Sequence, residues 1–305
     1  MGATIQMTAH AKINTFLGVT GRREDGYHTL LSHMQAVTLC DTLNLMWERE
    51  EVQQPCIEIL CDRAGVPCDA SNLIYRAASL LLEALKQRGV QVGGRWSFSL
   101  EKRIPMAAGL AGGSADAAAA MRMVNQLLNT PLTIDRLCEI GATIGADIPF
   151  CLRCDEGAMT ARGIGEQLER TVGLMPDAWL LIACHGEVVS TPWAFRRLDE
   201  KGHEDTEQLE QRYEKFLDSV RTGRLDALAA TAYNCFESVV MPERPVIAQL
   251  KREMLQRGAA LALMSGSGPS VVGYFADHTT AMTCAASFAE QGIEAHVCQG
   301  LEAKR

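Results

Sequence analysis

The stretch Pro105-Met-Ala-Ala-Gly-Leu-Ala-Gly-Gly-Ser-Ala-Asp-Ala117 constrains the fold more than any other part of the chain. It joins a predicted strand that ends near Ile104 to a predicted helix over residues 114–129. Its glycines and alanines leave the backbone amides uncovered, and glycine permits the positive φ angles that turn successive N–H groups toward one point. A helix start adds unpaired N–H groups and the positive end of the helix dipole. Together these features predict a phosphate seat, with a plain glycine-rich turn as the alternative.

Two common phosphate-binding patterns do not fit this loop. No lysine precedes Ser114, so the loop is not a Walker A sequence. Residue 107 is alanine where the first glycine of a G-x-G-x-x-G fingerprint would fall. Ser114 could donate a hydrogen bond to a phosphate oxygen or hold Mg²⁺.

Composition indicates a globular protein. The 305 residues include 29 Lys and Arg against 37 Asp and Glu, which gives a formal net charge of −8. Hydrophobic residues make up 47%, which excludes a disordered chain, and the acidity argues against binding along a nucleic-acid backbone. No stretch approaches the roughly 20 apolar residues of a membrane span. Residues 1–10 lack the pattern of a signal peptide, so we expect a cytoplasmic protein.

The eleven cysteines do not form the pattern of a secreted disulfide scaffold, because their number is odd and the chain is long. Most lie alone among apolar neighbours, where buried reduced thiols are expected. Cys151 and Cys154 form a C-x-x-C pair, for which a metal site, a redox pair and chance spacing all stay open.

Helical and strand patterns alternate in a way that predicts an α+β fold with a boundary near residue 155, giving domains of residues 1–155 and 156–305. The charged stretch 196–211 is expected to be a surface connection. Helices are expected over residues 72–86, 114–129, 133–144, 206–220, 245–256 and 279–291. Strands are expected over residues 13–19, 42–47, 57–61, 96–102, 179–184, 261–265, 271–275 and 294–298.

The loop at residues 105–117 resembles the ATP-binding motif of the GHMP kinases, which phosphorylate small alcohols. The run Ala11-Lys-Ile-Asn-Thr-Phe-Leu-Gly-Val-Thr-Gly-Arg-Arg-Glu-Asp-Gly-Tyr-His28 is similar to one branch of that family, whose substrate is 4-diphosphocytidyl-2-C-methyl-D-erythritol. Four further stretches match in the family's order: Ser71-Asn-Leu-Ile74, Gly145-Ala-Asp-Ile-Pro149, Gly163-Ile-Gly-Glu166 and Ser265-Gly-Ser-Gly-Pro269.

The resemblance implies a two-domain α+β GHMP kinase fold with the active site in the interdomain cleft. It also implies ATP as phosphate donor, with Mg²⁺, and transfer to the 2-hydroxyl of the substrate in the non-mevalonate isoprenoid pathway. The nucleotide would be bound by the loop and by one asparagine: Pro105, Met106, Ala107, Ala108, Gly109, Leu110, Ala111, Gly112, Gly113, Ser114, Ala115 and Asn72. A helix cap is the alternative role for Asn72.

Phosphoryl transfer to an alcohol also needs a base and charge neutralisation. Asp147 has small and apolar neighbours that favour a partly desolvated carboxylate, although a turn-forming role is the better reading of the local sequence. Lys12 begins an apolar strand, where an unpaired ammonium is costly, so it is expected to point into a polar site or a structural salt bridge. By resemblance, Asp147 is the catalytic base and Lys12 organises the charge.

Recognition of cytidine is assigned by resemblance as well. The Tyr27 ring would stack on the base, His28 would bond its edge and Phe195 would close its other side. Asn14 and Thr191 are weaker candidates for the methylerythritol or the diphosphate. A surface turn at Tyr27 and His28, and a packing role for Phe195, are the alternatives.

One position departs from the family pattern. Cys235 stands where the family usually has aspartate, so no carboxylate role is expected there. Two other functions stay open at this point. The chain could be another GHMP kinase, of the homoserine or mevalonate type, or a catalytically silent nucleotide-binding relative.

Overall fold

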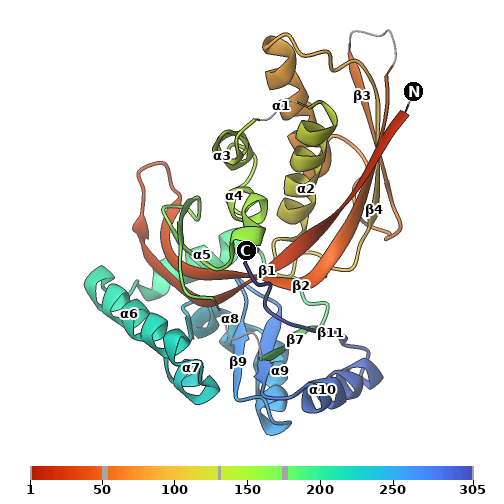
Figure 1. Cartoon of the computed structure of the whole chain (residues 1–305). Helices are drawn as coiled ribbons and strands as arrows, with labels where there is room; N and C mark the ends of the chain where they lie inside the picture. The colour runs from red at the N-terminus through yellow and green to blue at the C-terminus, as the bar shows by residue number, and fades with distance from the viewer. Residues whose placement is uncertain (1, 50–53, 130–131, 174–177, 304–305) are drawn as a thin grey trace. The chain divides into compact units, whose positions relative to one another are not determined.

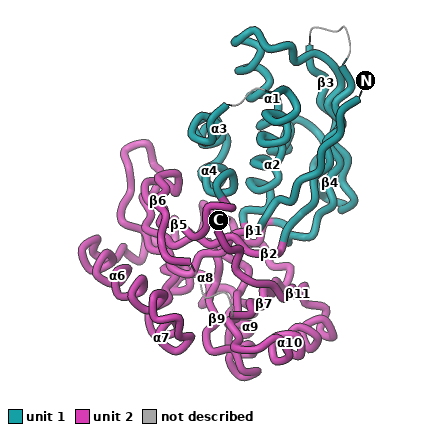
Figure 2. The backbone as a smooth tube through the Cα atoms, viewed as in Figure 1, with its two compact units in different colours: residues 1–11, 40–106, 111–153 teal, residues 12–39, 107–110, 154–305 magenta. Residues whose placement is uncertain are grey.

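The computed structural model describes residues 2–49, 54–129, 132–173 and 178–303. The chain forms two compact units (Figure 2). Unit 1 comprises residues 1–11, 40–106 and 111–153, and unit 2 comprises residues 12–39, 107–110 and 154–305. Neither unit is one continuous segment, because two long strands, β1 (Gly2–Arg22) and β2 (His28–Glu48), contribute residues to both.

Unit 1 contains a strand layer and a helical layer (Figure 1). Strand β4 (Gly94–Glu101) pairs antiparallel with the end of β2 and parallel with β3 (Pro55–Cys61). Helices α1 (Leu73–Gln87) and α2 (Gly112–Leu127) pack side by side, and α1 also lies against β3. The short helices α3 (Ile134–Ala142) and α4 (Ile148–Leu152) pack against each other, and α4 also contacts α2.

The alternation of buried and exposed residues explains strand β4, and a capping side chain explains where helix α1 begins. Along β4, the buried Trp96, Phe98 and Leu100 alternate with more exposed polar residues, as in a strand with one covered face. Helix α1 begins where the Asn72 side chain accepts a hydrogen bond from the backbone N of Ile74. Its buried residues recur at helical spacing and form one apolar face: Ile74, Ala77, Ala78, Leu81, Leu82 and Leu85.

Unit 2 contains a four-stranded antiparallel sheet in the order β11-β7-β10-β9. Its strands are β7 (Trp179–Cys184), β9 (Leu261–Met264), β10 (Val271–Phe275) and β11 (Glu294–Cys298). Helices α9 (Pro245–Gln256) and α10 (His278–Glu290) pack on this sheet (Figure 1). Their apolar faces meet alternate residues of the strands, including Leu181 and Val271, in one buried core.

The remaining elements of unit 2 surround the inner parts of β1 and β2. Strand β5 (Met159–Arg162) pairs with β2 and with β6 (Gln167–Arg170), and β8 (Tyr233–Asn234) pairs parallel with β1. The helical elements of this region are η1 (Cys154–Glu156), α5 (Thr191–Lys201), α6 (Thr206–Thr222), α7 (Leu225–Thr231) and α8 (Glu237–Glu243). No helix of the described residues is long and apolar enough to cross a membrane.

Most predicted elements are confirmed, with three corrections. The stretch 196–211 is not a connection, because α5 and the start of α6 occupy all but residues 202–205. The helix of the glycine loop begins at Gly112, two residues before the predicted start. Strands β1 and β2 each span 21 residues, because pairing with neighbouring strands extends them well beyond their apolar centres.

Candidate active site

The backbone of the glycine loop turns through three left-handed positions. They are Ala107 with φ +50°, Gly109 with φ +75° and Ala111 with φ +56°. The sequence predicts that the glycines supply the positive φ angles, and this is only partly correct. Gly112 and Gly113 are the first residues of α2. Two alanines instead adopt the left-handed conformation, which is normally unfavourable for a residue that has a Cβ atom.

Hydrogen bonds to its carbonyl oxygens explain how the loop is held. The three successive carbonyls of Ala108–Leu110 accept hydrogen bonds, in chain order, from N of Ser270 at 3.3 Å, Oγ of Ser265 at 3.0 Å and N of Lys12 at 3.1 Å. The turn between β9 and β10 and the inner part of β1 therefore fix this side of the loop. A loop whose carbonyls are bound in this way can present its amides to an anion.

The start of α2 continues the loop without a capping side chain. Ala111 occupies the N-cap position and makes no side-chain hydrogen bond there. The N–H groups of the first helical turn, which includes Gly112, Gly113 and the half-buried Ser114, therefore keep their capacity to bind an anion. The helix dipole adds attraction for negative charge at this end.

A buried ion cluster, which the sequence analysis missed, anchors both ends of the loop within unit 1. Nζ of Lys102 lies 2.5 Å from Oδ2 of Asp41 on β2 and 2.6 Å from Oδ2 of Asp116 on α2. Oδ1 of Asp41 also accepts hydrogen bonds from the backbone N of Arg103 and of Ile104. Local patterns gave no signal for this cluster, because Lys102 is 14 positions from Asp116 and 61 positions from Asp41 in the chain.

The three charges of this cluster perturb one another. Burial raises the pKa of Asp116 and the nearby Asp41 carboxylate raises it further, against the opposing effect of the Lys102 ammonium. Burial alone would lower the pKa of Lys102, but the two carboxylates outweigh it and raise this pKa. Oδ1 of Asp116 is buried without a hydrogen-bond partner among the described residues.

Lys12 is buried in unit 2 and points into a polar network. Its Nζ donates a hydrogen bond to Oδ1 of Asn14 at 2.6 Å. Nδ2 of Asn14 donates in turn to Oγ of Ser32 at 2.8 Å, and Oδ1 of Asn14 accepts from the backbone N of Gly266 at 3.1 Å. This network joins the lysine to the turn that also holds the glycine loop.

Asp147 occupies the N-cap position of α4 in unit 1, and Lys12 belongs to unit 2. The aspartate side chain makes no capping hydrogen bond, and the residue is half-buried. Pro149 follows within the first turn of α4, where a missing N–H costs nothing. The carboxylate is thereby left available to a ligand.

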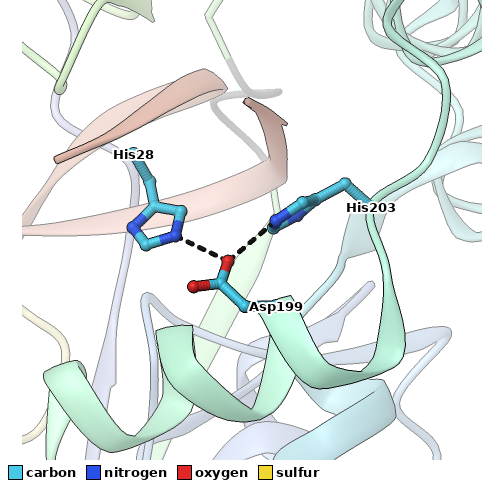
Figure 3. Close-up of side chains that lie close together, drawn as sticks. All are labelled: His28, Asp199 and His203. Atoms are coloured by element: carbon cyan, nitrogen blue, oxygen red, sulfur yellow. Dashed lines mark hydrogen bonds and ion pairs between the residues drawn. The ribbon is translucent and has the colours of Figure 1, made fainter. Parts of the chain in front are cut away.

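His28 and Phe195 form a stacked pair in unit 2. Their ring centroids lie 4.4 Å apart at an interplanar angle of 17°, and Phe195 also packs edge-on against the buried Phe236. Nε2 of His28 lies 2.7 Å from Oδ1 of Asp199 on α5 (Figure 3). Tyr27, the preceding residue, is 60% exposed and offers a free ring face.

Three other predicted positions have clear local contacts. Oγ1 of Thr191 lies 2.9 Å from Oγ of Ser267 in the turn between β9 and β10. Asn72 caps α1, and its Nδ2 donates a hydrogen bond to the carbonyl of Pro67. Cys235 is buried, and burial raises the pKa of its thiol to about 12, so it remains a neutral side chain in the core.

Comparison with known proteins connects this site to a family. The family description "GHMP kinases N terminal domain" matches residues 72–154, which include the glycine loop and Asp147. The description "GHMP kinases C terminal" matches residues 216–294, which include the turn that holds the loop. The chain belongs to the GHMP kinase family. It is therefore an ATP-dependent kinase of small molecules.

Individual GHMP kinases match over almost the whole chain. The 4-diphosphocytidyl-2-C-methyl-D-erythritol kinase of Geobacter sulfurreducens is 38% identical over 92% of this chain and 93% of its own length. The kinase of the same name from Enterococcus faecalis is 40% identical over 86% of this chain and 87% of its own length.

Solved structures agree with this assignment. A crystal structure of 4-(cytidine 5'-diphospho)-2C-methyl-D-erythritol kinase matches with a TM-score of 0.78 and 30% identity, over 97% of this chain and 100% of that one. A homoserine kinase from Cytophaga hutchinsonii matches with a TM-score of 0.73 at 18% identity, over 98% of this chain and 96% of its own. At that identity the second match shows a shared fold alone.

Proposed function

We propose that this GHMP kinase transfers the terminal phosphoryl group of ATP to the 2-hydroxyl of 4-diphosphocytidyl-2-C-methyl-D-erythritol, giving the 2-phosphate and ADP, in the non-mevalonate route to isoprenoid precursors. The observation that carries the proposal is the 38–40% identity, over most of both chains, to relatives that bear the name of this kinase. The fixed glycine loop, the buried lysine and the available carboxylate supply the groups that this reaction needs.

In this proposal the nucleotide phosphates bind at the glycine loop and at the start of α2. Support comes from the loop carbonyls, which are held by Ser265, Ser270 and Lys12, so that the amides are free to receive an anion. The hydroxyl of Ser114 would contact a phosphate or Mg²⁺. A hydroxyl oxygen is a suitable ligand for Mg²⁺, because this hard cation prefers oxygen ligands. Asn72, at the start of α1, would lie near the adenosine.

Asp147 would accept the proton of the attacking hydroxyl, since a half-buried carboxylate without a capping hydrogen bond can receive it. Lys12 would stabilise the negative charge that develops on the acceptor oxygen. Its ammonium is fixed by Asn14, so little reorganisation is needed when that charge appears. Asn14 and Thr191 would contact the methylerythritol or the diphosphate.

The cytosine would bind beside Tyr27, His28 and Phe195. The exposed Tyr27 ring offers a stacking face, and the next residue, His28, has a side chain that is 9% exposed. We also propose that the protein works in the cytoplasm, and that residues 1–155 and 156–305 act as its two functional domains.

The test is an assay of ADP release coupled to NADH oxidation, with purified full-length protein. We expect turnover with 4-diphosphocytidyl-2-C-methyl-D-erythritol and none above background with homoserine or mevalonate. Turnover of homoserine or mevalonate alone would assign the chain to another branch of the family. Nucleotide binding without turnover of any of the three would indicate a silent relative.

A further inference from the structure

Asp199 connects two imidazoles that come from different parts of unit 2. Its Oδ1 lies 2.7 Å from Nε2 of His28, at the start of β2, and 2.8 Å from Nε2 of His203, just after α5 (Figure 3). Arg22 adds a positive charge 3.6 Å from the other carboxylate oxygen. Burial alone would raise the pKa of Asp199, but the hydrogen bonds from both histidines lower it, so the carboxylate is ionised at neutral pH.

An ionised carboxylate accepts hydrogen bonds and cannot donate them. Nε2 of His28 must therefore carry the hydrogen in this contact. A neutral imidazole has one N–H and one nitrogen lone pair, so Nδ1 of His28 is then an acceptor. Within the part of the chain that the structure describes, this Nδ1 has no hydrogen-bond partner of its own.

The ring of His28 is also held in position. Its side chain is 9% exposed, and Phe195 stacks on one of its faces at 4.4 Å. Together the stack and the bond to Asp199 prevent the ring from flipping to exchange its two nitrogens. A fixed acceptor in a half-buried site selects ligands that present a donor, because a second acceptor would leave both groups unpaired.

We propose that Asp199, assisted by His203, is a positioning residue that fixes His28 as a hydrogen-bond acceptor at Nδ1 and thereby selects cytosine over uracil. This inference rests on the proposed function, in which His28 contacts the base. Cytosine presents its exocyclic amino group as a donor where uracil presents a carbonyl oxygen. The same pocket with the other tautomer would donate from Nδ1 and would favour uracil.

A divalent metal ion is the competing explanation for this cluster, since the three ligand atoms lie within 4.8 Å of one another. The distances favour hydrogen bonds. Two ligands of a tetrahedral zinc ion are about 3.3 Å apart, because each lies about 2.0 Å from the metal, whereas both histidine nitrogens are within 2.8 Å of the carboxylate oxygen. The Arg22 guanidinium beside Asp199 also opposes a second cation.

The test compares kcat/KM for the diphosphocytidyl substrate with that for its diphosphouridyl analogue. In Asp199→Ala the tautomer of His28 is no longer fixed, so we expect the preference for cytidine to fall at least tenfold, mainly through KM. His203→Gln should reduce the preference for cytidine by a smaller factor than Asp199→Ala does. Glu200→Ala, an exposed neighbour on α5, is the matched control and should keep the preference of the unsubstituted protein. An unchanged preference in Asp199→Ala would overturn the proposal.

A second readout is independent of the proposed substrate. The ¹⁵N shifts of His28 should show hydrogen on Nε2 in the unsubstituted protein and a mixture of tautomers in Asp199→Ala. If the cytidine substrate is not turned over at all, the proposed function is wrong. The tautomer measurement would still test whether Asp199 fixes the hydrogen on Nε2 of His28, because it needs no substrate. Hydrogen on Nδ1, or stoichiometric Zn²⁺ binding by calorimetry that is lost in His203→Gln, would contradict the positioning role.

Discussion

Gly109 and Ser265 approach each other so closely that a Cβ on Gly109 would lie 2.2 Å from the carbonyl oxygen of Ser265. Gly109 also has φ +75°, so glycine is required there for two separate reasons. From the other side, a Cβ on Gly266 would lie 3.1 Å from the carbonyl oxygen of Gly109. The glycine loop and the turn between β9 and β10 thus fit against each other at these two glycines, where a side chain on either would be too close to the opposite backbone.

Gly109→Ala should therefore damage both stability and nucleotide binding. The left-handed conformation costs an alanine about 1–2 kcal/mol, and the clash with Ser265 adds about 1–3 kcal/mol as overpacking. We expect a fall of at least about 2 kcal/mol in the free energy of unfolding. Urea denaturation measures this fall, and calorimetry with a non-hydrolysable ATP analogue should show weakened binding.

Gly89→Ala separates the two causes. Gly89 follows α1 with φ +81°, but nothing lies within 4 Å of the position its Cβ would take. This variant should show the conformational cost alone, about 1–2 kcal/mol, with ATP binding unaffected. Equal losses of stability in both variants would mean that the contact with Ser265 is unimportant.

Gly113→Ala tests the amides of the helix start rather than the fold. Gly113 is exposed in the first turn of α2, and its nearest neighbour would be Leu73 Cδ1 at an ordinary 3.4 Å. Alanine favours helix over glycine by about 0.5–1 kcal/mol, so stability should rise slightly. The new methyl group should nevertheless raise the KM for ATP about tenfold, equivalent to about 1.4 kcal/mol of binding. An unchanged KM would place the phosphates elsewhere.

The sequence predicted the helices and strands whose periodicity and capping residues lie within the element itself. Helix α9 begins and ends where the pattern placed it, and α1 begins at its predicted asparagine cap. A further local signal was overlooked in the first part of β1, where Ala3, Ile5 and Met7 alternate with more exposed residues at period 2. Helix α5 was missed because its charged residues hide a narrow buried face formed by Ala194 and Leu198.

Features that depend on distant partners could not be predicted in this way. The left-handed Ala107 and Ala111 flank a segment whose carbonyls accept hydrogen bonds from residues far away in the chain. Local propensities therefore cannot predict the conformation of these two alanines. Lys102 looks like a surface residue at the end of a strand, and only the folded chain brings two carboxylates to it. Asp199 lies 171 positions from His28, one of the two histidines that it contacts.

Lys102→Met should be strongly destabilising, because it leaves Asp41 and Asp116 buried without their counter-ion. We expect a loss of about 3–5 kcal/mol at pH 8. Asp116 already has a raised pKa, and without the lysine it should rise further. An acid whose pKa is higher in the folded than in the unfolded state loses stability as pH rises, so the loss should be smaller at pH 5.5.

Two variants make the Lys102 measurement decisive. Lys102→Met with Asp116→Asn removes one carboxylate as well and should recover part of the lost stability at pH 8. Lys215→Met, on the exposed face of α6, should stay within about 0.5 kcal/mol of the unsubstituted protein. A pH-independent loss in the single variant would contradict the charge explanation and indicate a packing defect.

Asp147→Asn should lower turnover strongly and leave nucleotide binding unchanged. If Asp147 is the base, removing its proton affinity should lower kcat by about 10²–10⁴-fold, while the glycine loop is unchanged. Rapid-quench measurement of kcat and calorimetry of ADP binding give the two quantities. Glu139→Gln, an exposed carboxylate on α3, is the control and should keep full activity. Full activity in Asp147→Asn would exclude this residue as the base.

His33 on β2 should make the protein sensitive to mild acid. Burial lowers its pKa from 6.5 to about 4, against the smaller opposing effect of its hydrogen bond to the carbonyl of Val172. The stability that the neutral ring contributes is present above pH 6.5 and is lost as pH falls, by about 3 kcal/mol at pH 4. His33→Gln should flatten this part of the curve in urea titrations, whereas His185→Gln, an exposed histidine, should not. Parallel curves for all three proteins would rule out His33 as the source.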